Sequence, residues 1–298
     1  MLGPRYLGQV NMVGSGGGHR MFLTTIGVNR ALNENHIKPN NYIATSMSAP
    51  AFAMMATDYY DSKQMKEIER EFMVPENLFC EEVAKNWHNN SELKQITSIV
   101  MNRDKNNTDK IREKLLDKQN GIDMEKTMDS RYGFAVATTE LPHGLMRGLL
   151  FKDKIGHSAC KEIVKSVDEL TDWTIATNIN PAAYKKGITI NGVEQWDGCI
   201  TSQTPIIEST KHYPYADYTF VVQNNTKDFM TYERPITEDI VLRLGELVVF
   251  DIAKFAVETG KLPPVSTFDF GKKVDETEQY GYELGQYFIE KARDEGVL

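Results

Sequence analysis

Two short turns near the start of this 298-residue chain hold residue types that suit acyl transfer. The first is a glycine loop at residues 16–20 (GGGHR), between an expected strand and an expected helix. Its backbone N–H groups at a helix start would favour an anion or a developing oxyanion. The second turn, at residues 44–48 (ATSMS), presents Ser46 where a strand gives way to a helix. In an open α/β sheet both turns fall at the carboxyl ends of strands, where ligands bind.

Each turn also has an ordinary structural explanation. Ser46 is well placed to cap the helix that follows it. The glycine loop could instead hold a nucleotide phosphate. The dinucleotide pattern G-x-G-x-x-G fails in both frames, because His19 and Met21 stand where the last glycine is needed. No Lys-Ser/Thr ending follows as in a P-loop, so the sequence disfavours nucleotide binding.

Alternating strand and helix patterns must position these turns, and they predict one α/β domain over residues 1–298. Strands are expected at 6–14, 42–45, 131–141, 148–151, 173–177 and 218–222, and a hairpin with an Asn191-Gly192 turn at 188–198. Helices are expected at 20–35 (interrupted by Gly27), 48–60, 158–170, 237–260 with Thr237 as its cap, and 275–294.

Residues 61–120 differ from the rest of the chain because they are rich in Lys, Glu and Asn, and they predict a helical insertion or cap. Ser91 is expected to cap a helix that runs to Met101. The apolar residues of that helix fall on one face: Leu93, Ile96, Ile99 and Val100. A solvated helical layer is the simpler interpretation, and a lid over a site is the alternative.

Composition excludes several classes of function. Lys plus Arg number 34 against 42 Asp plus Glu, and the net charge of −8 argues against nucleic acid as a partner. Three cysteines, Cys80, Cys160 and Cys199, lack metal-ligand spacing and indicate reduced thiols in a cytoplasmic protein. The six histidines are scattered, so no metal site is expected, and the segment from His157 to Cys160 is expected on a surface helix. No apolar run is long enough to cross a bilayer, so any contact with membranes would be peripheral.

Three motifs in order resemble those of the patatin-like phospholipases, acyl hydrolases that use a serine–aspartate dyad. The run at 15–20 is similar to the family's oxyanion loop, and the turn at 44–48 is similar to its nucleophile elbow. Asp197-Gly198-Cys199, with Pro205 further on, is similar to the motif that supplies the aspartate. Weaker similarities at 137–141, 176–184 and 284–285 extend the resemblance over residues 8–292.

The resemblance implies a three-layer α/β/α sandwich with a largely parallel central sheet. It also implies that Ser46 is the nucleophile and Asp197 the base, with no histidine between them. By the same resemblance the N–H groups of Gly16, Gly17 and Gly18 form the oxyanion hole, supported by Arg20 and Gly198. Without the resemblance, Asp197 is equally an ordinary turn aspartate after the hairpin.

The implied activity is hydrolysis of phospholipid or lysophospholipid esters without a cofactor. Ala44, Ser48, Met21 and Cys199 stand at positions where the family usually has glycine. These departures motivate a second hypothesis, a catalytically silent protein of the same fold that binds lipid or a protein partner. A third hypothesis keeps the dyad but transfers the acyl group to an acceptor other than water.

Overall fold

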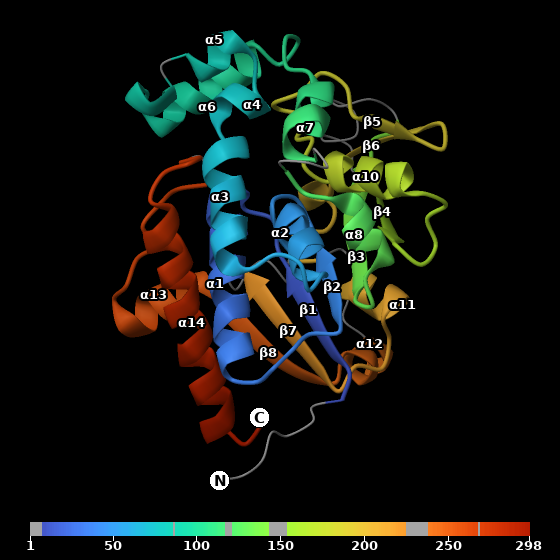
Figure 1. The fold of residues 1–298 in the computed structure, drawn as a ribbon, viewed down its shortest axis with the longest axis vertical. Helices are drawn as coiled ribbons and strands as arrows, with labels where there is room; N and C mark the ends of the chain where they lie inside the picture. The colour runs from blue at the N-terminus through green and yellow to red at the C-terminus, as the bar shows by residue number, and fades with distance from the viewer. Residues whose placement is uncertain (1–7, 86, 117–120, 143–153, 225–237, 268) are drawn as a thin grey trace.

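A central sheet of eight strands organises the chain in a computed structural model, which describes residues 8–85, 87–116, 121–142, 154–224, 238–267 and 269–298 (Figure 1). The strands are β1 (Val10–Gly14), β2 (Asn41–Ala44), β3 (Gly133–Glu140), β4 (Ile155–Cys160), β5 (Ile188–Ile190), β6 (Val193–Asp197), β7 (Tyr218–Gln223) and β8 (Glu246–Asp251). Their order is β5-β6-β3-β2-β1-β7-β8, and β4 pairs with β3. β1, β2, β3, β7 and β8 run parallel to one another, whereas β4 and β6 run antiparallel to β3.

Helices connect these strands. They are α1 (Gly18–Glu34), α2 (Ser48–Met55), α3 (Ser62–Phe72), α4 (Pro75–Leu78), α5 (Glu81–Ala84), α6 (Glu92–Met101), α7 (Thr108–Leu115), α8 (Met124–Asp129), α10 (Val167–Ala176), α11 (Ile206–His212), α12 (Glu238–Leu244), α13 (Ile252–Thr259) and α14 (Val274–Asp294). Short 3-10 helices lie at η1 (Trp87–Asn89) and η2 (Gly198–Ile200). Within the described ranges, no helix combines the length and apolar character that a bilayer crossing needs.

Successive residues of the central strands enter two different cores. Met12 and Phe220 belong to the larger apolar cluster, which also contains residues of α1 and α14. Their neighbours Val13 and Val221 belong to a second cluster, with Ile206 of α11 and Leu244 of α12. A strand that is buried on both faces in this way reads as a continuous apolar run. The predicted three-layer α/β/α sandwich with a largely parallel central sheet is therefore confirmed.

Strand register places the site. Gly14 at the end of β1 lies opposite Ala44 at the end of β2, so the two following turns start side by side. Ala44 pairs with Val136 of β3, and Thr138, two residues further along β3, pairs with Asp197. Ser46 comes two residues after Ala44, so Ser46 and Asp197 reach the same level at the carboxyl ends of the parallel strands.

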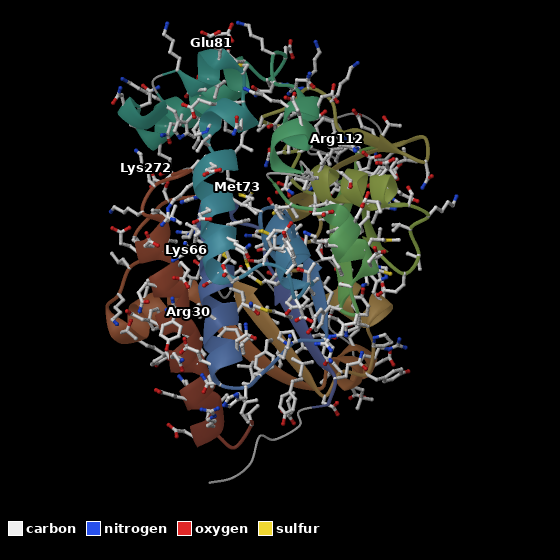
Figure 2. All side chains as sticks on the ribbon, viewed as in Figure 1. Arg30, Lys66, Met73, Glu81, Arg112 and Lys272 are labelled. Carbon is white, nitrogen blue, oxygen red and sulfur yellow. The ribbon has the colours of Figure 1, made fainter. Side chains whose placement is uncertain are left out.

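The segment between β2 and β3 contributes a separate group of helices. Figure 1 shows α4, α5, α6 and α7 gathered at one end of the molecule, beyond the carboxyl ends of β1 and β2. Ion pairs tie α3 and α1 to the last helix: Lys66 to Asp275 and Arg30 to Glu278, each at 2.9 Å. Figure 2 labels Lys66 and Arg30. Residues 62–115 thus contain helices and no strand among those described, and their role as an insertion or cap stays a prediction.

Three expected elements are wrong. Residues 158–170 were expected to be helical, but β4 occupies 155–160 and places His157 and Cys160 on a strand. The expected strand at 173–177 falls on the last residues of α10 and its C-cap, Thr177. Ser166 caps the start of this helix, since its hydroxyl oxygen accepts from the N–H of Glu169. A short buried apolar run does not distinguish strand from helix by periodicity alone, and here neighbouring elements decide.

The single helix expected at 237–260 is divided by β8. Gly245 has a φ of +64° and no room for a Cβ atom beside the carbonyls of Ala216 and Asp217, so the chain turns there. Residues 246–251 then pair with β7 as an edge strand. The helix expected at 48–60 ends at Met55. The expected strand at 148–151 and the cap at Thr237 lie outside the described residues.

Close packing of α1 on α14 explains the glycine that interrupts the apolar stripe of α1. A Cβ atom on Gly27 would overlap the backbone of Glu278 and Tyr282, and one on Gly281 would overlap the backbone of Thr24. The two helices therefore touch at facing glycines.

Gly27→Ala should destabilise the protein despite the better helix propensity of alanine. We expect a loss of about 1–3 kcal/mol in the free energy of unfolding, because the helices must separate to admit the methyl group. Chemical denaturation measures it, with Asn33→Ala at an exposed position of the same helix as the control. A Gly27→Ala protein as stable as the wild type would contradict this packing.

Candidate active site

Ser46 occupies a strained turn between β2 and α2. Its φ is +54°, in the left-handed region that residues other than glycine rarely adopt. Its N–H donates to Thr177 Oγ1 at 2.9 Å, and its carbonyl accepts from the N–H of Ala49 at 2.8 Å. Met47, not Ser46, is the N-cap of α2, and no side-chain cap bond forms there. The helix-cap explanation therefore does not account for the Ser46 hydroxyl.

Small residues on both sides of Ser46 fit this turn without being glycine. Ala44 is fully buried at the end of β2. Ser48 donates its hydroxyl to the carbonyl of Ser15 at 2.6 Å, which ties the turn to the glycine loop. A Cβ atom on Gly14 would lie 2.7 Å from Cβ of Ser48, so the glycine on β1 makes room for the larger residue.

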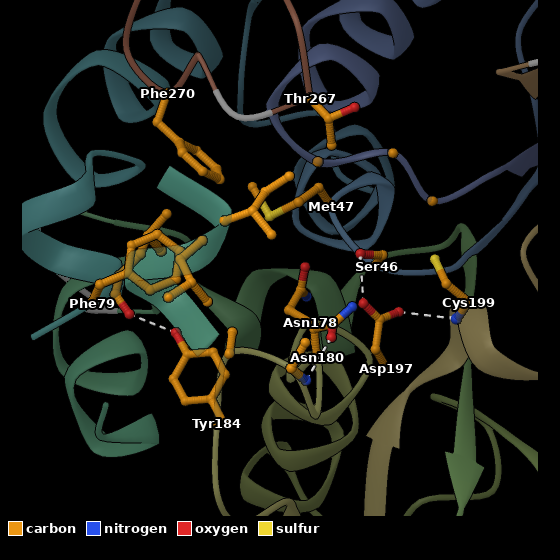
Figure 3. A pocket seen from close by; sticks show the side chains of 18 of the residues that line it. Ser46, Met47, Phe79, Asn178, Asn180, Tyr184, Asp197, Cys199, Thr267 and Phe270 are labelled. Carbon is orange, nitrogen blue, oxygen red and sulfur yellow. Dashed lines mark hydrogen bonds between the residues drawn. The ribbon is translucent and has the colours of Figure 1, made fainter. Parts of the chain in front are cut away.

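The Asp197 carboxylate accepts a hydrogen bond from the Ser46 hydroxyl. Ser46 Oγ donates to Asp197 Oδ2 at 3.2 Å, while Asp197 Oδ1 accepts from the N–H of Cys199 at 2.9 Å (Figure 3). The side chains come from residues 151 apart and are 7% and 4% exposed. Burial raises the pKa of Asp197 to about 6, although the bonds from Cys199 and Ser46 oppose part of that rise. This environment differs from that of a solvated turn aspartate.

The three glycines of the loop have different roles. The N–H of Gly16 donates to the carbonyl of Gln203 at 2.9 Å, so the expectation that it serves an oxyanion is corrected. Gly17 and Gly18 line the same cavity as Ser46, and in the described part of the chain their N–H groups donate to no protein acceptor. Gly18 has a φ of +62° and lies against the carbonyl of Thr267, where a Cβ atom would overlap.

Gly16 and Gly198 instead permit close approach. A Cβ atom on Gly16 would overlap Cys199 Sγ and lie 3.1 Å from Cβ of Ser46. A Cβ atom on Gly198 would overlap the carbonyl oxygen of Ala137 on β3. Because neither residue has a side chain, the glycine loop, β3 and the turn that holds Asp197 can pack closely beside Ser46.

Arg20 lies one turn into the loop's helix and points toward the end of β7. Its Nη2 donates to Asn224 Oδ1 at 2.8 Å, and Asn224 also lines the cavity. This bond anchors the glycine loop to the next strand of the sheet, which is a supporting role.

A buried pair that sequence reasoning missed also holds the loop. His19 and Glu69 are both fully buried, and His19 Nδ1 contacts Glu69 Oε1. His19 Nε2 lies 3.1 Å from the carbonyl of Lys272, and Phe270 packs edge-on against the imidazole. Burial raises the pKa of Glu69. Nothing in the sequence linked His19 to a glutamate on α3.

The cavity beside the dyad has a volume of about 420 Å³ and two chemically different ends. Near Ser46 and Asp197 its walls carry amide side chains: Asn178, Asn180, Gln203 and Asn224. Figure 3 shows Phe79, Tyr184 and Phe270 on the side away from Asp197. Apolar side chains of the helical segment complete that end: Leu78, Ile96, Ile99, Val100 and Ile111. Among the described residues no three His, Cys, Asp or Glu side chains gather as a metal site requires.

Comparison with solved structures finds a similar fold. VipD from Legionella pneumophila matches over 95% of this chain and 67% of its own, with a TM-score of 0.51 and 10% identity. Human GIVD cytosolic phospholipase A2 matches over 52% of this chain and 22% of its own, with a TM-score of 0.33 and 12% identity. No family model and no curated protein matches the sequence. At 10% identity the likeness to VipD concerns the fold alone, an α/β architecture with a largely parallel central sheet.

Cys199 should tune the acidity of Asp197. Its thiol bonds to the Asp197 carboxylate and lowers the pKa, so Cys199→Ala should raise the pKa of Asp197 above the wild-type value of about 6. NMR titration of ¹³C-labelled aspartate carboxyl groups measures both values. Cys80→Ala, a half-buried thiol elsewhere, is the control. An unchanged Asp197 titration in Cys199→Ala would contradict the contact.

Proposed function

We propose that this protein is a lipid acyl hydrolase of phospholipase A or lysophospholipase type. The bond from Ser46 Oγ to Asp197 Oδ2 at 3.2 Å carries the proposal. It joins a hydroxyl on a strained strand–helix turn to a buried carboxylate, beside a loop with two available N–H groups. Nucleophile, base and oxyanion donors are the parts that acyl transfer through a serine requires.

The reaction follows from these positions. Asp197 takes the proton from Ser46 Oγ as the oxygen attacks the ester carbonyl carbon. The carbonyl oxygen becomes an oxyanion that accepts from the N–H groups of Gly17 and Gly18, each such donor being worth about a hundredfold or more in rate. The protonated Asp197 then returns its proton to the leaving alcohol. A water that loses its proton to Asp197 then attacks the carbonyl carbon of the acyl-serine. The bond from this carbon to Ser46 Oγ breaks, the fatty acid leaves, and the proton on Asp197 returns to Ser46 Oγ.

The raised pKa of Asp197 suits this role. A solvated aspartate has a pKa near 4 and is too weak a base to accept a serine proton readily near pH 7. Burial brings the pKa to about 6, closer to the working pH. Because only the ionised carboxylate acts as the base, kcat/KM should fall about tenfold per pH unit below about 6.

The cavity supports a lipid ester as the substrate class. Its amide-lined end at the dyad suits the ester and glycerol portion, and its apolar end suits an acyl chain. A volume of about 420 Å³ is at the small end of ligand pockets, which favours one acyl chain over two.

Ser46→Ala and Asp197→Asn should each lower ester hydrolysis by at least about a thousandfold while leaving the fold intact, because each removes half of the dyad. Ser46→Ala should also abolish labelling by a fluorophosphonate probe. A lipid panel and gel-based labelling measure these effects, with Ser62→Ala on α3 as a serine control away from the cavity.

Two outcomes separate the rival functions. If the wild type is never labelled and turns over no ester, the silent lipid- or protein-binding hypothesis replaces this one. If acyl groups pass to added lysolipid or alcohol faster than to water, the protein is an acyltransferase that uses the same dyad.

A further inference from the structure

Helix α6 presents an apolar face to solvent. Leu93 is 74% exposed and Met101 78%, while Ile96 and Val100 are 39% and 44% exposed. Their spacing of three, four and one residues places them on one side of a helix. Ile99 at the edge of this face and Gln95 on the opposite side are buried, and Gln95 Nε2 donates to the carbonyl of Trp87 at 2.9 Å. The buried side of α6 thus packs on the protein, and its apolar side faces solvent.

This face continues into the catalytic cavity. Ile96 and Val100 line the cavity that also contains Ser46 and Asp197, and both side chains are partly exposed. An acyl chain that moves from this face to the dyad stays against apolar side chains. The exposed apolar side chains of α6 and those that line the cavity therefore form one continuous apolar surface along which an acyl chain could move.

Charge also bears on how this face could be covered. Residues 93–101 (LKQITSIVM) contain no Asp or Glu, and Glu92 at the start of α6 precedes them. The chain as a whole has 42 Asp and Glu residues and a net charge of −8. A carboxylate-free apolar face can enter the headgroup region of a bilayer without desolvating a negative charge. The excess negative charge elsewhere disfavours an anionic surface, so a zwitterionic one fits better.

We propose that the exposed face of α6 docks on a zwitterionic phospholipid bilayer and passes lipid from it into the cavity. The passage of substrate rests on the proposed hydrolase function, whereas the docking does not. The occupant is the lipid surface itself, because the face leads into a cavity with an apolar end.

Docking is tested in the Ser46→Ala background, so that no substrate is consumed. Flotation with phosphatidylcholine vesicles should recover the protein, and adding Leu93→Gln with Met101→Gln should lower the partition coefficient about tenfold or more. Leu242→Gln with Val257→Gln is the control, since these residues of α12 and α13 are 76% and 86% exposed away from α6. This control should bind as the parent does.

With Ser46 restored, hydrolysis separates docking from chemistry. The Leu93→Gln, Met101→Gln protein should lose about tenfold more activity on vesicle phospholipid than on a soluble short-chain ester. Equal vesicle binding by this double variant and the control would overturn the proposal. The proposal would also be overturned if the wild type is a dimer that does not bind vesicles and the double variant is a monomer. A second copy of the chain would then cover the face. Vesicle binding by a wild type that hydrolyses neither ester would refute the hydrolase alone.

Discussion

Gly14, Gly16 and Gly198 each lie too close to a neighbouring segment to carry a Cβ atom. The segments they approach are the start of α2, the Asp197 turn and β3, which surround Ser46. Protein interiors do not relax freely around an added methyl group, so a side chain at these positions would move the serine or its partner. The dyad distance of 3.2 Å therefore depends on three places where only hydrogen fits.

Local sequence predicted the parts of the fold that local chemistry determines. The glycine loop, the Ser46 turn and the Asn191-Gly192 hairpin each depend on residues within a few positions of one another. The errors at 158–177 and 237–260 arose where tertiary pairing decides. β8 is a strand because β7 offers it an edge, and β4 is a strand because it pairs with β3. Neither neighbour is visible in an apolar run.

The sequence likewise predicted the main residues of the candidate site but not the long-range contacts that hold them. Ser46 and Asp197 could be proposed from the order of motifs, since that order reflects a shared fold. The bond from Gly16 to Gln203 could not, and neither could the contact of His19 with Glu69, because both join residues far apart in the chain. The cavity was also beyond sequence reasoning, because its walls come from the glycine loop, α4, α6, α7 and the segment before β5.

In the proposed reaction Asp197 is the only base, and this requirement links the helical segment to the chemistry. Water around Asp197 would return its pKa toward 4 and weaken the base, so the site must keep that carboxylate dry. The apolar side chains of α4, α6 and α7 line the cavity, and the contact of His19 with Glu69 fixes α3 against the glycine loop. The same helices that would hold an acyl chain thus also limit the water that reaches the base. Substrate binding and base strength would therefore both depend on the packing of these helices. An acyl chain that fills the cavity would exclude the remaining water just before proton transfer.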